Sequence, residues 1–581
     1  MTCSKSALPK SPLRGIKISL AVALLTSLIG CASKLSDTVE PSAAPQPEPS
    51  YGQLEEVVVT GTRQSTSSRN EAPRSVAVES ALPHPQDAEI ITTNRSDSNL
   101  PVLRKDSSYQ IYKNYGVNPT ISTATEQYST FAMDVDTVSY QLAKANLKAN
   151  QLPSKASIRV EEFVNNFAYD YGTTDDVFSV SAEVVPSPYR PGFHLLHIGV
   201  KAKHIPDAQR LPANIVLLAD VSGSMNGDDK MGLQKQALTA LVSQLSPKDS
   251  VAIVTYSQST TVLLPPTRAN KKKTVYAAIQ KMSAGGGTNV EQGLMRGYKV
   301  AAKMAYPGHV NRVVLTSDGL ANIGNVDPSA ILKQVEDYKR RNIFLTTVGV
   351  GQSMYNDYLL EQLANKGNGN YLYLANQSDI ERVFVDGLTS QLQAVAKDAK
   401  IQLQFNPKRV SLFRQIGYEN RSLQTEDFLD ASKDGGEVGA NQQVTALYEI
   451  KLTGQSTDAE LANVALSYKK PQGSKVFSFT KSIPSSVLRT TTDHASPDTL
   501  LSMSVAAFAE KLRQSYWSRS YDYLHIQSQL SRLPSQLRDS LQLKELQDLV
   551  SQASIIDSRR DPYNKELPIS RIDYDRVPLL R

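Results

Sequence analysis

Oxygen-bearing side chains follow an apolar run near residue 220, in a spacing that suits metal binding. The apolar run from Ile215 to Ala219 leads into Asp220, and Ser222 and Ser224 follow at alternate positions. A continuous apolar run of this length is typical of a strand buried on both faces, so we expect a central parallel strand. Open α/β sheets bind ligands just outside the carboxyl ends of their strands. One carboxylate and two hydroxyls should therefore lie at that edge.

Two later segments carry matching groups. Thr288 follows the glycines Gly285–Gly287, and Asp318 follows a second apolar run that begins at Val313. If all three segments end at one edge of the sheet, they supply two carboxylates and three hydroxyls, without histidine or cysteine. Hard divalent cations prefer such ligands; Mg²⁺ fits best, Mn²⁺ also fits, and Ca²⁺ fits less well. With only two acids around it, the cation would keep positive charge and could capture a carboxylate from a partner.

The pattern Asp-x-Ser-x-Ser, with a distant Thr and a distant Asp-Gly, resembles the metal-ion-dependent adhesion site (MIDAS) of von Willebrand factor A domains. All five positions match: Asp220, Ser222, Ser224, Thr288 and Asp318. The resemblance implies that the three hydroxyls contact the ion, that the acids bind it directly or through water, and that a protein partner offers an Asp or Glu. Segments 131–137, 159–162, 416–421 and 444–449 are similar to YfbK-like envelope lipoproteins of Gram-negative bacteria.

The elements that position these residues alternate between strand and helix. Strands are predicted at 215–219, 251–256, 313–316, 343–349 and 371–374, and helices at 230–245, 272–282, 290–305, 328–340, 355–364 and 378–395. This order predicts an α/β fold with a doubly wound parallel, Rossmann-like sheet. Strand patterns flank it at 177–185, 193–200, 401–405, 444–452, 464–469 and 476–480. We expect them to meet in one β-sandwich-like domain, into which the von Willebrand A domain is inserted, with C-terminal helices after it.

Smaller features near residue 136 and in the second flanking strand also bear on metal binding. Asp134 and Asp136 precede a predicted helix that runs to about residue 150, and we interpret them as turn and capping residues rather than metal ligands. A second helix is predicted at about 157–167. His194 and His197 are three apart in a predicted strand, so they should point to opposite faces and share no metal.

The predicted organisation of the chain has six parts. These are a lipoprotein signal peptide (1–30), a disordered tether (31–108), an N-terminal α+β flanking domain (109–210), the von Willebrand A domain (211–395), a β-rich flanking domain (396–490) and a C-terminal helical region (491–581).

The N-terminus has the features of a targeting segment. Basic residues precede an apolar run over 18–29, which is too short to span a membrane but fits a signal-peptide core. The run ends in Leu28-Ile29-Gly30-Cys31, which resembles the lipobox of bacterial lipoproteins. By that resemblance Cys31 carries the lipid, and Ala32 after it implies the outer membrane, with the protein facing the periplasm. An ordinary cleaved signal is the alternative. The other cysteine is Cys3, so neither lies in the predicted folded body.

Composition and motifs limit the other functions. The net charge is +6, and four of these charges lie in residues 1–30, which argues against nucleic-acid binding. The sequence contains no Gly-x-Ser-x-Gly, phosphate-loop or His-Glu-x-x-His motif, so we expect a binding protein and not an enzyme. A metal-dependent hydrolase is one alternative. Residues 54–63 resemble the N-terminal segment of TonB-dependent receptors, so docking to a TonB-type envelope system is another.

Overall fold

The computed structural model describes residues 103–105, 111–133, 136–319, 323–325, 327–351, 357–454 and 459–563. All lie in the second of the two units into which the chain divides, 88–581. The predictions for the signal segment, Cys31, residues 54–63 and Asp134 lie outside the described residues. Strand β1 (Leu103–Lys105) pairs with β2 (Ile111–Lys113), so the end of the segment predicted as a tether, 31–108, takes part in a strand pair. The partner strand lies beyond the polar segment, whose composition alone therefore did not reveal the pairing.

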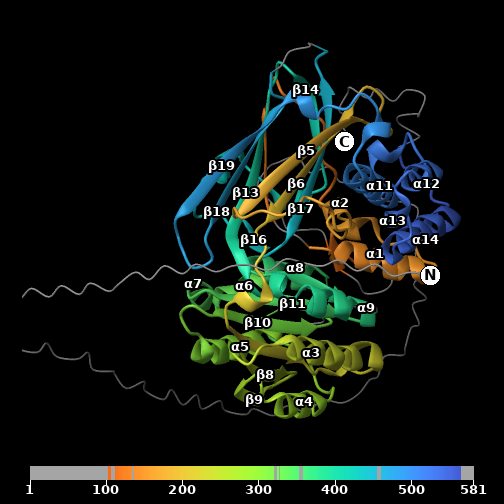
Figure 1. Ribbon diagram of the computed structural model, residues 1–581. Coiled ribbons are helices and arrows are strands. Elements are labelled where there is room, and N and C mark those ends of the chain that lie inside the picture. The colour runs from red at the N-terminus through yellow and green to blue at the C-terminus, as the bar shows by residue number, and fades with distance from the viewer. Residues whose placement is uncertain are drawn as a thin grey trace, which may run out of the picture. The chain divides into compact units, whose positions relative to one another are not determined.

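A six-stranded sheet forms the centre of the α/β part (Figure 1). Its order is β12-β11-β10-β7-β8-β9, with bounds β7 (Ala213–Asp220), β8 (Ser250–Tyr256), β9 (Thr260–Arg268), β10 (Val310–Ser317), β11 (Ile343–Val350) and β12 (Tyr371–Leu374). The strand order reverses between β7 and β10, which are parallel neighbours. This is the topological switch point at which open α/β sheets bind ligands.

The edge strand β9 runs antiparallel to β8 and was not predicted. It contains Pro265 and Pro266, residues that weaken a strand pattern but are tolerated at the edge of a sheet. The predicted doubly wound α/β class is confirmed, and the sheet carries this one antiparallel edge in addition.

Helices cover both faces of the sheet. They are α3 (Leu233–Gln244), α4 (Lys272–Gln280), α5 (Val290–Met304), α6 (Pro328–Lys333), α7 (Glu336–Arg340), α8 (Asp357–Lys366), α9 (Gln377–Ile380) and α10 (Leu388–Leu392). Alternate residues of β7 enter two different apolar clusters: Ile215 and Leu217 pack with α3 and α4, and Val216 and Leu218 pack with α5 and α8. Burial on both faces explains why the strand is a continuous apolar run.

Two predicted helices are broken in the structure. The span 328–340 forms α6 and α7, and the span 378–395 forms α9, a π-helical turn (Glu381–Asp386) and α10. Gly387 separates the last two, and the chain enters strand β13 at Ala394. The predicted helix to residue 395 is therefore wrong at its end, because pairing within the next sheet determines the backbone there.

Two antiparallel sheets flank the α/β part and share one apolar core. The first contains β4 (Tyr128–Ala132), β13 (Ala394–Phe405), β15 (Ser422–Leu423), β16 (Gly436–Gly439), β18 (Ala462–Lys469) and β19 (Val476–Ile483). The second contains β3 (Ile121–Ser122), β5 (Phe178–Pro186), β6 (His194–Ala202), β14 (Val410–Ile416) and β17 (Gln443–Leu452). Both combine strands from before and after the α/β part, which confirms the predicted insertion into a β-sandwich-like domain.

The chain enters and leaves the α/β part at one place. The backbone N–H of Leu211, just before β7, donates to Oε1 of Gln393, just before β13, at 2.9 Å. Both connections thus adjoin the amino end of β7, opposite to the edge where Asp220 lies.

Helices pack beside the sandwich, in a cluster that joins the two ends of the described chain (Figure 1). They are α1 (Val138–Lys148), α2 (Val160–Val164), α11 (Pro497–Leu512), α12 (Tyr523–Ser531), α13 (Ser535–Arg538) and α14 (Leu541–Ile556). Helix α2 is shorter than the predicted span 157–167. Among the described residues, no helix is both long and apolar enough to cross a membrane.

Candidate metal centre

Asp220 ends β7, and its carboxylate is held from several sides. The backbone N–H of Ser222 donates to Oδ1 at 2.9 Å. The hydroxyls of Ser317 and Tyr256 donate to Oδ2 at 2.6 and 3.3 Å. Burial raises the pKa of Asp220 to about 6, although hydrogen bonds from Ser317 and Ser222 lower it and the charge of Asp318 raises it further. The carboxylate is thus fully buried and fixed in orientation at the switch point.

The two serine hydroxyls lie together in the turn after β7. Oγ of Ser222 and Oγ of Ser224 are 3.1 Å apart. Ser222 is buried, whereas Ser224 is half-buried. The turn therefore presents two adjacent hydroxyl oxygens between the buried acid and the surface.

The loop that carries Thr288 is hydrogen-bonded to this turn. The backbone N–H of Gly223 donates to the carbonyl oxygen of Gly286 at 2.8 Å, and that of Gly285 donates to Val221 at 2.8 Å. Thr288 is buried two residues before the start of α5, and its carbonyl oxygen accepts from the backbone N–H of Ile323 in the loop after Asp318. Backbone hydrogen bonds thus connect the three segments that carry the predicted ligands.

Asp318 follows β10 and is fully buried. Its Oδ2 lies 3.0 Å from Nζ of Lys230, which is itself buried in a π-helical turn (Asp228–Gly232). Ser317, the residue before Asp318, bonds to Asp220, so the two acids lie at the ends of neighbouring strands. The structure therefore brings all five predicted residues to one edge of the sheet.

Four residues near the two acids were not singled out from the sequence: Lys230, Gln234, Tyr256 and Ser317. The side-chain amide of Gln234 donates to the backbone oxygen of Asp220 at 2.9 Å, which fixes the end of the strand. In the sequence, Lys230 begins a predicted helix and Tyr256 ends a predicted strand. Of the four, only Ser317 could have been identified from the sequence, because it directly precedes Asp318.

The donor chemistry of the five residues fits a hard divalent cation. They supply carboxylate and hydroxyl oxygens at a ligand-binding edge, and the negative charges of Asp220 and Asp318 act on each other. A cation between them would relieve that repulsion. Oxygen-only sets of this kind suit Mg²⁺ or Mn²⁺.

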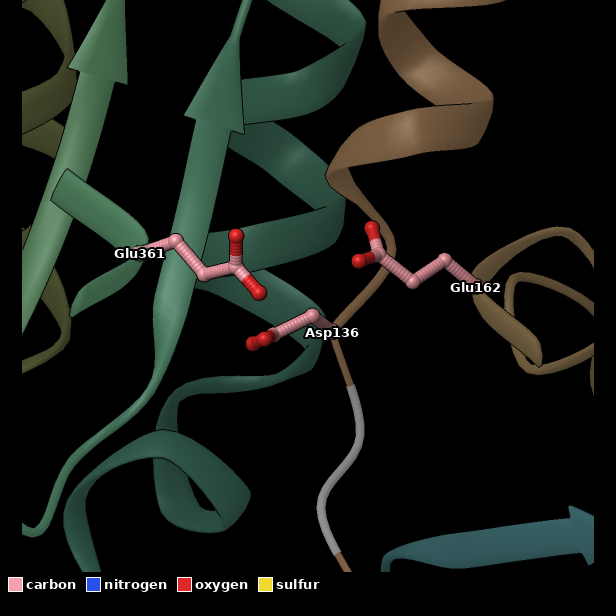
Figure 2. A group of neighbouring side chains, drawn as sticks. All are labelled: Asp136, Glu162 and Glu361. Carbon is pink, nitrogen blue, oxygen red and sulfur yellow. The ribbon is translucent and has the colours of Figure 1, made fainter. Parts of the chain in front are cut away.

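A second group of acids lies elsewhere, at the contact between the α/β part and the flanking domain. Carboxylate oxygens of Asp136, Glu162 and Glu361 all lie within 4.8 Å of one another, and all three residues are buried. Figure 2 shows Glu162 and Glu361 extending toward each other from different elements, with Asp136 beside them. Glu361 lies on α8, Glu162 on α2, and Asp136 just before α1.

Arginines and amides satisfy these acids. Asp136 accepts from Arg421 at 2.5 Å and from the backbone N–H of Tyr371 at 3.2 Å. Arg159 pairs with Glu162 and lies 3.9 Å from Glu361. These contacts make the group an ion-pair joint between the α/β part and the flanking domain. They also correct the prediction for Asp136, which does not cap α1 but binds Arg421, a partner far away in the sequence.

The two histidines of β6 differ in their surroundings. His197 is buried, and its ring nitrogens bond to hydroxyls, with Tyr171 at 2.7 Å and Ser502 at 3.1 Å. Burial lowers its pKa to about 4, although Glu183 raises it slightly. His194 lies three positions earlier on the same strand, where successive side chains alternate between the faces, and it is half-buried.

Comparison with known proteins identifies the same regions. A family model for the von Willebrand factor type A domain matches residues 214–386. A model described as the C-terminal part of the uncharacterized protein YfbK matches 390–556, and one described as von Willebrand factor matches 106–197.

Curated relatives extend the similarity beyond the A domain. The uncharacterized protein YfbK of Escherichia coli (strain K12) is 33% identical over 442 residues, which cover 71% of this chain and 76% of that protein. The uncharacterized protein sll0103 of Synechocystis is 30% identical over 190 residues, 32% of this chain and 44% of that protein. Human inter-alpha-trypsin inhibitor heavy chain H2 is 29% identical over 167 residues, 27% of this chain and 17% of that protein.

Solved structures show weaker likeness. A von Willebrand factor type A protein from Catenulispora acidiphila aligns with a TM-score of 0.40 and 14% identity, over 66% of this chain and 91% of that one. Proximal thread matrix protein 1 of the mussel byssus, described with a zinc-occupied MIDAS motif, aligns with a TM-score of 0.25 and 22% identity, over 30% and 46%. The identity to the Escherichia coli protein covers most of both chains, and the A domain and the region after it each match their own model. The chain therefore belongs to the YfbK family of proteins with a von Willebrand factor type A domain.

Proposed function

We propose that this protein binds a protein partner through a divalent cation held by Asp220, Ser222, Ser224, Thr288 and Asp318. Mg²⁺ is the cation that we favour, and a partner Asp or Glu supplies the completing ligand. The observation that carries the proposal is the convergence of two buried acids and adjacent hydroxyls at the switch point of the sheet. Von Willebrand A domains are mostly adhesion or interaction modules, which agrees with a binding role.

Asp220 and Ser224 have distinct physical roles in this proposal. The hydrogen bonds from Ser222, Ser317 and Tyr256 fix the carboxylate of Asp220 before any ligand arrives. The half-buried hydroxyl of Ser224 lies nearest to the surface and marks the side from which a ligand approaches. The cation, when bound, supplies positive charge that attracts a carboxylate. Besides the two acids the site offers only neutral hydroxyls, so the partner's carboxylate would be a third charged ligand.

A metal-dependent hydrolase fits the site less well. Hydrolysis by metal-activated water needs a positioned general base. The partners described for Asp220 and Asp318 are hydroxyls, amides and an ammonium group. Turnover of phosphoester or ester substrates that is lost in Asp220→Ala would replace the binding proposal with this one.

Thermal denaturation with and without Mg²⁺ tests the metal site. Metal that binds only the folded state stabilises by RT ln(1 + [L]/Kd), about 2.7 kcal/mol at a hundredfold excess over Kd. We expect Mg²⁺ to raise the Tm of wild type but not that of Asp318→Ala or of the double variant Ser222→Ala/Ser224→Ala. The matched control is Ser243→Ala, which removes an exposed hydroxyl at the end of α3. Equal responses in wild type and in both site variants would refute the site.

We also propose that Cys31 anchors the protein by a lipid to the outer membrane, so that the site faces the periplasm. The proposal rests on the lipobox-like residues 28–31. Labelling of cells with a fatty-acid probe should mark wild type and not Cys31→Ser. A Mg²⁺-dependent crosslinking pull-down from intact envelopes, with Asp318→Ala as control, should then recover the partner. If the same partners survive Asp318→Ala but are lost on deletion of 54–63, docking through that segment replaces the proposal.

A further inference from the structure

We propose that Lys230 is an internal counter-cation of the metal site, which makes tight binding of the divalent cation depend on the carboxylate of the partner. The inference rests on the proposed function, because it concerns the same five oxygen ligands. Its geometric basis is the ion pair between Nζ of Lys230 and Oδ2 of Asp318, at 3.0 Å. The two side chains are 4% and 0% exposed, so salt and water screen this pair little.

The backbone at Gly351 leaves room for the methylene groups of the Lys230 side chain. Gly351 follows β11, and a Cβ built on it would lie 2.7 Å from Cγ of Lys230. The φ of Gly351 is +97°, a backbone conformation that favours glycine. The hydroxyl of Tyr373 donates to the carbonyl oxygen of Gly351 at 2.7 Å, which holds this backbone in place. Lys230 is therefore confined, and its charge stays beside Asp318.

The charges of the site then explain the dependence on a partner. Asp220 and Asp318 contribute two negative charges, and Lys230 offsets one of them. With a divalent cation present, the buried site carries one net positive charge, which a carboxylate from outside neutralises. Without Lys230, the charges of the cation and the two acids would already sum to zero. The lysine thus weakens binding of the cation alone and couples it to binding of the partner, a coupling that acts equally in both directions.

Isothermal titration calorimetry of the full-length protein with Mg²⁺, which measures the Kd, tests this assignment. We expect Lys230→Met to bind Mg²⁺ about tenfold or more tightly than wild type, because a confined positive charge beside the site is removed. The matched control is Lys235→Met, which makes the same change where the ammonium group bonds to the carbonyl oxygen of Gln280 at 3.1 Å. Lys235→Met should match wild type. Acetate, used as the carboxylate probe, should tighten Mg²⁺ binding in wild type and not in Lys230→Met.

The outcomes separate this inference from the function on which it rests. If wild type binds Mg²⁺ and Lys230→Met binds it with the same Kd, the counter-cation role is overturned and the metal site stands. If wild type binds no Mg²⁺, the proposed function fails, and this inference fails with it. If Lys230→Met does not fold, Lys230→Gln removes the charge but keeps a hydrogen-bond donor toward Asp318. It should again bind Mg²⁺ more tightly than wild type, and an unchanged Kd in that variant would overturn the inference.

Discussion

Glu161→Gln should stabilise the protein at alkaline pH and leave it nearly unchanged in acid. Glu161 is buried on α2, and its Oε2 accepts from the backbone N–H of Tyr418 at 2.8 Å. Burial raises its pKa to about 7 from 4.5, and the charges of Glu419 and Glu162 raise it as well, while the amide of Tyr418 lowers it. Glutamine keeps an oxygen acceptor for that amide and carries no charge, so it resembles the protonated acid.

The magnitude follows from the two pKa values. A tenfold change in an equilibrium constant is worth about 1.4 kcal/mol, so the rise from 4.5 to about 7 amounts to about 3 kcal/mol. The folded protein holds the proton more tightly than the unfolded chain does. The stability that Glu161 contributes is therefore fully present below pH 4.5 and is lost as the pH rises through about 7. At pH 8 the wild-type protein has therefore lost this part of its unfolding free energy, whereas Glu161→Gln has no carboxyl group there to ionise and keeps it.

Urea denaturation at pH 5 and pH 8 measures the difference. The variant should exceed wild type by about 3 kcal/mol at pH 8 and by less than about 1 kcal/mol at pH 5. The control is Glu426→Gln, which removes an exposed acid and should show no such dependence. If Glu161→Gln changes stability by the same amount at both values, Glu161 is not a buried acid that resists ionisation.

Three further predictions follow from buried contacts elsewhere. Arg421→Met should lower the free energy of unfolding by about 3–5 kcal/mol in urea denaturation, because it removes the arginine that pairs with the buried carboxylate of Asp136; an unchanged midpoint would show that this ion pair adds nothing. Gly369→Ala should lower the Tm, since its Cβ would lie 1.7 Å from a backbone carbonyl oxygen, whereas Gly473→Ala, with 3.7 Å of space, should not; equal Tm values would refute the close approach. Burial lowers the pKa of His197 to about 4 from 6.5, so the stability that this residue contributes should be complete above pH 6.5 and should be lost as the pH falls toward 4. The ring signals of His197 in NMR spectra should therefore not titrate between pH 8 and pH 5, and a titration midpoint above pH 6 would contradict its burial.

The convergence of the five candidate ligands could be predicted because each part of the pattern is local in the sequence. Asp220 and Asp318 end apolar runs, and a strand buried on both faces produces such a run. Thr288 follows glycines directly before α5, which is also a local signal. Once parallel strands are assumed, their carboxyl ends must meet at one edge. Chain order and strand type were therefore enough to place the five residues together.

The surroundings of those ligands could not be predicted, because they depend on distant pairing. Lys230 and Asp318 are 88 positions apart, and nothing near Lys230 distinguishes it from an exposed lysine at the start of a helix. Asp136 has the local appearance of a capping residue, yet its partner Arg421 is 285 positions away. Edge strand β9 was not predicted because its two prolines weaken the strand pattern. Non-local ion pairs leave no periodic pattern, so only the folded chain reveals them.

The side-by-side connections at Leu211 and Gln393 have a mechanical consequence. Because the A domain is an insertion, two chain connections hold it to the sandwich, one that continues from β6 and one that enters β13. They lie at the end of β7 opposite to the candidate metal site, so tension applied by a captured partner would be shared between two anchors in different sheets. A single proteolytic cut in either connection would leave the domain attached through the other. The arrangement would suit the proposed capture of a partner, because two connections carry more tension than one.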